Sequence, residues 1–205
     1  MELYRTVAGS ARAEQVIKKS RFIVSIAPVE TREDAEAYID AVNKEFRDAT
    51  HNVPAMVIGE NMEIQWASDN GEPQGTAGVP MLRVLTGEGV TNAVIVVTRY
   101  FGGIKLGTGG LSRAYSGMAK LGLEAAGIRT VRETLEVRAQ MEYTYFQRLR
   151  RAAEEAGYAL SDIEYTDTVT VTLSGASENA EKMKNLLSDV TAGTAKTVSE
   201  RVKKS

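Results

Sequence analysis

The pattern of apolar and polar positions predicts a strand followed by an amphipathic helix near the start of the chain. Residues 20–29, SRFIVSIAPV, have the β-branched content of a strand. Thr31 and Asp34 then fit the spacing of a helix capping box. Apolar residues recur after it on one helical face, at Ala35, Ile39, Val42 and Phe46.

Further along, the pattern predicts two short strands, a helix and a buried strand. Residues 52–59 and 62–67 indicate a hairpin that turns at Glu60 and Asn61. Residues 80–87 favour a short helix opened by a proline and ended by a glycine. Residues 92–100, NAVIVVTRY, lack alternation, as in a strand covered on both faces. An amphipathic helix should follow and end at Gly127.

The pattern changes at residue 134, where apolar and polar residues alternate through Met141. Thr144 and Gln147 suggest a capping box for a helix that ends at Gly157. Two strands, a helix from about Ser177 and a last strand follow, at 158–165, 168–174, 177–192 and 195–202. The order βαββαβ in about 70 residues is typical of a ferredoxin-like fold.

We therefore expect an α+β protein with two domains, residues 1–131 and 132–205. Its net charge of −2 is evenly divided, with 14 basic and 15 acidic residues in the first part and 11 and 12 in the second. Neither part is a polybasic nucleic-acid module, so any anion site should be local.

The composition excludes several kinds of site. The chain has no cysteine, which rules out a disulfide partner, a thiol nucleophile and a cysteine-ligated metal. Its one histidine, His51, is too little for a tight zinc site, and no G-x-S-x-G nucleophile motif occurs. The first 20 residues have no apolar core segment, and the longest apolar run is far too short to cross a membrane. We expect a cytoplasmic protein without membrane contact, metal or cofactor.

The most unusual stretch is RYFGGIKLGTGGLSR, residues 99–113, at the junction of a strand and a helix. Helix N-termini carry unpaired N–H groups and a partial positive charge, so this junction favours an anion or nucleic-acid site. Its candidate residues are Arg99, Tyr100, Phe101, Gly102, Gly103, Lys105, Gly107, Gly109, Gly110 and Arg113. The alternative is that the glycines only permit tight turns and that the basic groups are solvated. Neither a phosphate-binding P-loop nor a dinucleotide fingerprint is complete here.

A second candidate site lies in SDNGEPQGTAGVP, residues 68–80. Its members, with the single histidine, are His51, Asp69, Glu72, Gly75 and Thr76. Two carboxylates could act as acid and base, while the structural alternative is turn formation by Asp69 with Glu72 facing water.

These two strings together resemble the paired signature of the YigZ/IMPACT family, and the resemblance covers nearly the whole chain. It implies an N-terminal α/β sandwich like the second domain of a small-subunit ribosomal protein. It also implies a C-terminal ferredoxin-like domain similar to the last domain of elongation factor G. Eukaryotic relatives act in translational control, where they compete for the co-activator of a starvation-sensing kinase.

The resemblance also marks motif positions in this chain, including Gly71, Pro73 and Tyr115 beside the candidates above. One departure matters, because Asn70 stands where the family usually has aspartate. This change weakens any two-acid or metal mechanism but suits a turn.

Two functions remain open from the sequence. In the first, the protein regulates translation by contacting RNA, the ribosome or a translation-related protein through the basic glycine-rich loop. In the second, it is an enzyme acting on a phosphorylated or carboxylated small molecule held by the same loop.

Overall fold

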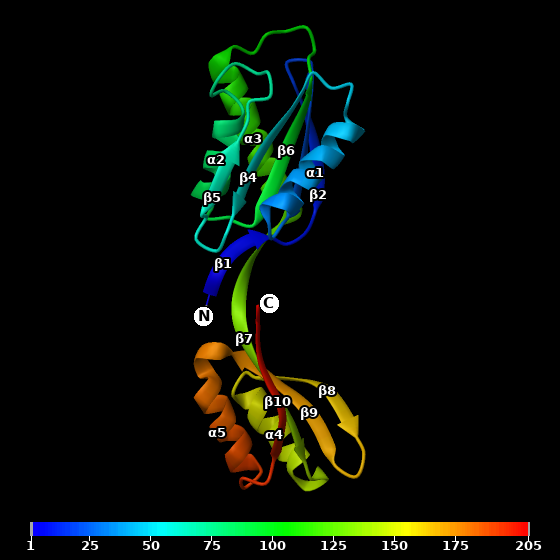
Figure 1. Ribbon diagram of the computed structural model, residues 1–205, viewed down its shortest axis with the longest axis vertical. Helices are drawn as coiled ribbons and strands as arrows, with labels where there is room; N and C mark the ends of the chain where they lie inside the picture. The colour runs from blue at the N-terminus through cyan, green and yellow to red at the C-terminus, as the bar shows by residue number, and fades with distance from the viewer. Residues whose placement is uncertain (1, 205) are drawn as a thin grey trace. The chain divides into compact units, whose positions relative to one another are not determined.

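The computed structural model describes residues 2–204, which form ten strands, five α-helices and one 3-10 turn (Figure 1). In chain order these are β1 (Glu2–Val7), β2 (Ala11–Ile17), β3 (Ser20–Pro28), α1 (Arg32–Glu45), β4 (His51–Ile58), β5 (Ile64–Ala67), α2 (Gly78–Gly87), β6 (Ala93–Tyr100), α3 (Thr108–Ala126), β7 (Ile128–Met141), α4 (Tyr143–Glu155), β8 (Ala159–Tyr165), β9 (Val169–Ala176), η1 (Ser177–Asn179), α5 (Ala180–Val190) and β10 (Lys196–Lys204).

The described chain divides into two compact units. The N-terminal unit comprises residues 4–130, and the C-terminal unit comprises residues 131–204 together with residues 2 and 3. The expected α+β class with two parts is confirmed. The division falls within strand β7, which begins at Ile128 and runs through residue 131, so the chain passes from one unit to the other without a loop at this point.

The N-terminal unit is an antiparallel sheet of order β2-β3-β6-β4-β5 with helices on both faces (Figure 1). Helix α1 packs on one face, and α2 and α3 pack on the other. Central strand β6 sends Ile95 and Val97 into the α2–α3 core and Val94 and Val96 into the α1 core. Burial on both faces explains why its sequence shows no alternation.

The C-terminal unit has the expected βαββαβ order. The sheet has five strands, in which β7 pairs with β1, β9 and β10, and β9 pairs with β8. Helices α4 and α5 pack on one face, where Leu135, Val137 and Met141 alternate inward. On β7, Glu136 lies between them in sequence and forms ion pairs with Arg201 and Lys203 of β10.

Several local predictions were wrong. Helix α4 has Glu142 as its N-cap without a side-chain cap, so Thr144 lies inside the first turn and forms no capping box. The β4–β5 connection spans residues 59–63 because Ile58 pairs with Ile64. Helix α2 begins two residues before its proline. By contrast, the predicted capping box of Thr31 and Asp34 is present at the start of α1.

Candidate functional site

The register of the N-terminal sheet places Arg99 on its α2–α3 face. Side chains alternate along a strand, so Arg99 continues the inward series of Ile95 and Val97 on β6. Its neighbours across the sheet are Phe22 of β3 and His51 of β4. A cation, an imidazole and a phenyl ring therefore meet at the end of the sheet where the glycine-rich loop begins.

Glu72 brings a carboxylate to this buried cation. Its Oε1 accepts hydrogen bonds from Arg99 Nη1 at 2.6 Å and from the Tyr115 hydroxyl at 2.7 Å. The Arg99 and Glu72 side chains are only 6% and 3% exposed. Burial, followed by the hydrogen bond to Glu72, raises the pKa of Tyr115 far above its usual value, so the phenol stays a donor. The two candidate sites of the sequence thus share one buried core.

The Arg99 guanidinium also lies close to two aromatic rings. Its central carbon lies 5.5 Å from the ring centroid of Phe22 and 5.5 Å from that of Phe101. A guanidinium this close to ring faces gains cation–π attraction. Arg99 Nη2 donates to Ser20 Oγ at 3.4 Å, while its Nε finds no acceptor among residues 2–204. The positive charge of Arg99 is therefore neutralised by Glu72 inside the protein, and its side chain does not face solvent.

Asp69 folds the segment that inserts Glu72. Its carboxylate oxygens accept the backbone N–H groups of Gly75, Ala77 and Gly78 at 2.7, 3.0 and 2.9 Å. Burial opposes the charged form, but these three donors outweigh it and lower the pKa of Asp69 below its usual value. The Thr76 hydroxyl donates to the Pro73 carbonyl at 2.6 Å. Asp69 and Thr76 thus shape the turn, as the alternative of turn formation predicted for Asp69. The same alternative was wrong for Glu72, which it placed facing water and which is buried.

His51 and Asn70 anchor the start of the same segment. His51 Nδ1 lies 2.9 Å from the Asn70 carbonyl oxygen, and its Nε2 lies 3.9 Å from Glu72 Oε2. The Asn70 side-chain amide donates to the Asn52 carbonyl. At Gly71, φ is +87° and a Cβ would lie 3.1 Å from His51 Nδ1, so a glycine fits there. The expectation that Asn70 suits a turn agrees with this geometry.

The glycine-rich loop leaves the buried core directly after Tyr100. Phe101 is 47% exposed, although its N–H donates to Thr50 Oγ1 at 3.0 Å. A Cβ on Gly102 would lie 2.0 Å from the Lys19 carbonyl oxygen, so the loop backbone touches the β2–β3 turn there. Gly102 N also donates to Ser20 Oγ at 3.2 Å. Close approach of two backbones is the reason for glycine at this position.

The loop ends at the N-terminus of α3, where no side chain caps the helix. Gly107 is the N-cap with a φ of 74°, and Gly109 and Gly110 lie in the first turn. Lys105 and Arg113 are exposed beside this end, and neither forms an ion pair within residues 2–204. The helix end adds a partial positive charge to these two cations. Tyr100, by contrast, donates its hydroxyl to Asp48 Oδ1 at 2.9 Å.

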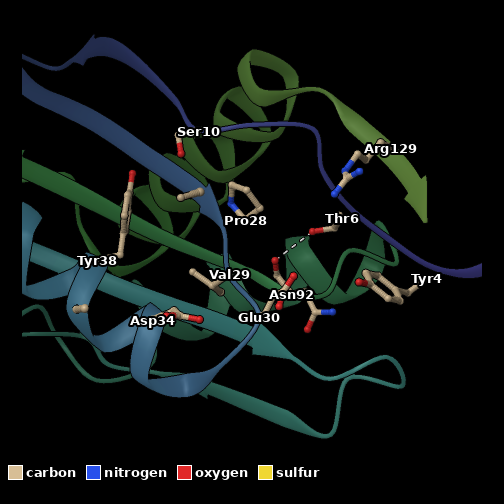
Figure 2. Close-up of a pocket in the computed structure, with 12 residues that line it drawn as sticks. Tyr4, Thr6, Ser10, Pro28, Val29, Glu30, Asp34, Tyr38, Asn92 and Arg129 are labelled. Atoms are coloured by element: carbon tan, nitrogen blue, oxygen red, sulfur yellow. Dashed lines mark hydrogen bonds between the residues drawn. The ribbon is translucent and has the colours of Figure 1, made fainter. Parts of the chain in front are cut away.

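Two surface grooves of the N-terminal unit lie outside this core. One holds about 680 Å³ beside the ends of β3 and α1, and Thr6 Oγ1 donates there to the Asn92 carbonyl at 3.0 Å (Figure 2). It contains none of the predicted site residues. The other holds about 500 Å³ between α2 and α3 and contains Gly75 alone among them. Its polar lining comes from Arg83, Lys120, Ser112 and Ser116 as well as Glu88.

The sequence-based candidates missed Ser20 and gave Tyr115 no role in either site. Ser20 is fully buried and its hydroxyl accepts from both Gly102 and Arg99. Neither residue carried a local signal, because β6 is apolar on both faces and its sequence does not show which face Arg99 shares with Tyr115 of α3.

Between residues 2 and 204, no helix combines the length and apolarity needed to cross a bilayer. In the same range, no three His, Asp or Glu side chains are grouped so that they could hold a metal ion.

Two families match this chain. The Impact N-terminal domain matches residues 18–123, which contain the whole Glu72–Arg99–Tyr115 core. A domain of unknown function, DUF1949, matches residues 140–194 in the C-terminal unit.

Individual relatives extend the match over most of the chain. IMPACT family member YvyE of Bacillus subtilis (strain 168) is 43% identical over 166 residues, 81% of this chain and 76% of that protein. IMPACT family member YigZ of Escherichia coli (strain K12) is 41% identical over 145 residues, 70% of this chain and 71% of that protein. A crystal structure described as a hypothetical protein is 32% identical, with a TM-score of 0.62, and the match covers 96% of this chain and 97% of that one.

Proposed function

Because the chain belongs to the IMPACT family, we propose that it regulates translation by binding RNA, the ribosome or a translation factor through the glycine-rich loop of residues 99–113. The observation that carries this proposal is the contrast between the loop and its base. Arg99 is buried and paired with Glu72, whereas Lys105 and Arg113 are exposed beside the uncapped start of α3. A buried, internally paired base with an exposed basic rim suits an anionic surface of a larger partner.

The site geometry favours binding over catalysis. Glu72 and Asp69 were the acid and base candidates, and each carboxylate is occupied by internal donors. His51 Nδ1 faces a backbone carbonyl. General acid–base catalysis requires a group within hydrogen-bond reach of a substrate. Neither groove described above is lined by these three residues.

The proposal places the protein in the cytoplasm, where translation occurs. It also assigns the binding role to the N-terminal domain, residues 1–131, and treats residues 132–205 as a second domain that folds separately. The loop variants below should therefore not change the folding of the C-terminal domain.

Co-sedimentation with purified ribosomes across a salt series tests the proposed function. The wild-type chain should pellet with ribosomes at low salt, and the variant Lys105→Ala/Arg113→Ala should stay in the supernatant. Two phosphate contacts to single-stranded RNA predict a slope of log K against log salt of about −1.4, which the variant should flatten.

A matched control removes two exposed lysines elsewhere, in the variant Lys44→Ala/Lys182→Ala. It should pellet like the wild type. Failure of the wild type to pellet at any salt concentration, or equal loss in both variants, would contradict ribosome binding by the loop and leave free RNA or a translation factor as its partner.

A further inference from the structure

The β2–β3 turn adds two lysines to the surface of the glycine-rich loop. Ile17 pairs with Ser20, so Lys18 and Lys19 are the two central residues of the turn. Both side chains are exposed, and the turn lies against the loop where a Cβ on Gly102 would meet the Lys19 backbone. In Figure 1 the β2–β3 turn and the β6–α3 loop lie at the same end of the N-terminal unit.

The backbone of this turn is unfavourable for lysine. Lys18 and Lys19 have φ values of 47° and 66°. A two-residue turn with positive φ at both centres is the type I′ turn, which strongly prefers Asn-Gly because these residues tolerate that region. Two lysines are therefore poorly suited to forming the turn itself, and strained residues of this kind are candidates for a functional role.

The glycine-rich loop also exposes two apolar side chains. Phe101 is 47% exposed and Ile104 is 41% exposed, and Lys105 follows directly in the loop. None of Lys18, Lys19 and Lys105 forms an ion pair within the described residues 2–204. Arg21, by contrast, is bound to Glu14 at 2.6 Å. We name Lys18, Lys19, Phe101, Ile104 and Lys105 the tip surface.

We propose that the tip surface binds an acidic protein segment that places an apolar side chain against Phe101 and Ile104 and carboxylates against the three lysines. An apolar centre with a charged rim is the usual anatomy of a protein–protein interface. Charge complementarity then selects an acidic partner. This inference rests on the proposed function, because it assigns a partner to the same loop.

The same surface is less suited to RNA. Single-stranded RNA is bound by series of aromatic rings on which successive bases stack. Phe101 is the single aromatic residue of the tip surface, and Arg99 already lies 5.5 Å from its ring centroid. An exposed isoleucine contributes to contact with an apolar side chain and offers nothing to a phosphate.

The test measures fluorescence anisotropy with three labelled probes. The first is a 16-residue peptide of glutamates with leucines at helical spacing, and the second replaces its leucines by glutamine. The third is single-stranded polyuridine RNA. The wild-type chain should bind the first peptide more tightly than the other two probes.

The key variant is Lys18→Asn/Lys19→Gly, which installs the favoured turn while removing two charges. It should melt at a higher temperature than the wild type and bind the leucine-containing peptide about tenfold more weakly. Ile104→Ser should weaken binding of the leucine-containing peptide severalfold and leave binding of the glutamine peptide unchanged. The control Lys44→Asn/Lys182→Asn should bind like the wild type.

The outcomes separate the two proposals. Loss of peptide binding in a more stable Lys18→Asn/Lys19→Gly variant supports this inference. RNA binding that the variant loses, without peptide binding by the wild type, overturns it and leaves the proposed function standing. Absence of binding to all three probes, together with wild-type pelleting on ribosomes, also overturns it. Absence of both binding and pelleting overturns the proposed function as well.

Discussion

Replacing Glu72 with glutamine is expected to lower the free energy of unfolding of the N-terminal unit by about 3–5 kcal/mol. Glutamine keeps the shape of the side chain and removes its charge. Arg99, whose side chain is 6% exposed, then becomes a buried cation without a counter-charge. Breaking a buried pair is costly because the remaining ion has lost both its partner and its water.

Companion variants identify the source of this loss. Tyr115→Phe removes one hydrogen bond to the Glu72 carboxylate and should cost about 1.5–3 kcal/mol. Arg99→Met leaves the carboxylate unpaired and should be at least as harmful as the glutamine variant. The double variant Glu72→Gln/Arg99→Met removes both charges. Its loss of unfolding free energy should therefore be smaller, by about 1–3 kcal/mol, than the sum of the losses in the two single variants.

Urea titration followed by tryptophan fluorescence provides the assay. Trp66, the one tryptophan of the chain, lies in β5 of the same unit and is 37% exposed. Linear extrapolation of each unfolding curve gives the free energies that the cycle requires. Glu14→Gln is the control, because it breaks an exposed pair with Arg21 and should cost less than about 1 kcal/mol. A Glu72→Gln variant as stable as this control, or strictly additive effects in the double variant, would refute the reasoning.

Three further predictions concern single features. Asp69→Asn should cost about 1–3 kcal/mol at pH 7 by calorimetry, since an amide cannot accept three backbone N–H groups. The folded pKa of Asp69 lies below its unfolded value, so its contribution is present above about pH 4 and is lost as pH falls through the folded pKa. The variant should therefore lose less stability on acidification, and an unchanged pH profile would contradict this. Gly102→Ala should destabilise by about 1–3 kcal/mol in urea titration because of its contact with Lys19, whereas Gly117→Ala on an open helix face should not. Residues 132–205 expressed alone should unfold in one cooperative thermal transition, and a broad, non-cooperative melt would count against an independent domain.

The elements that the sequence predicted well are those with a strong local pattern. Strand β6 is a continuous apolar run, β7 alternates, and the start of α1 carries its own capping box. Strands β1 and β2 had no such signal, because β2 has no buried residue and β1 buries only its last two residues. Such strands are defined by their partners, and β2 depends on its pairing with β3.

The sequence named candidate residues but gave no information on how they are arranged, and their binding role stays a prediction. The composition of residues 99–113 predicted an anion site, and in the structure Lys105 and Arg113 are exposed. The sequence around Arg99 did not show that its side chain points to the interior. That direction depends on which face of the sheet the odd-numbered residues of β6 occupy, and on the Glu72 carboxylate 27 positions earlier in the chain. Contacts between residues far apart in the sequence depend on the register of the sheet, which the local pattern does not give.

The ion pair between Glu72 and Arg99 also limits how this protein can evolve. A single substitution at either position leaves a buried charge, and a loss of about 3–5 kcal/mol is a large part of the 5–15 kcal/mol typical of a folded domain. A protein that carries only one of the two substitutions is therefore close to unfolding. The segments around residues 72 and 99 should be inherited together, and a chimera that exchanges one of them between homologues should fold only if it retains both charges.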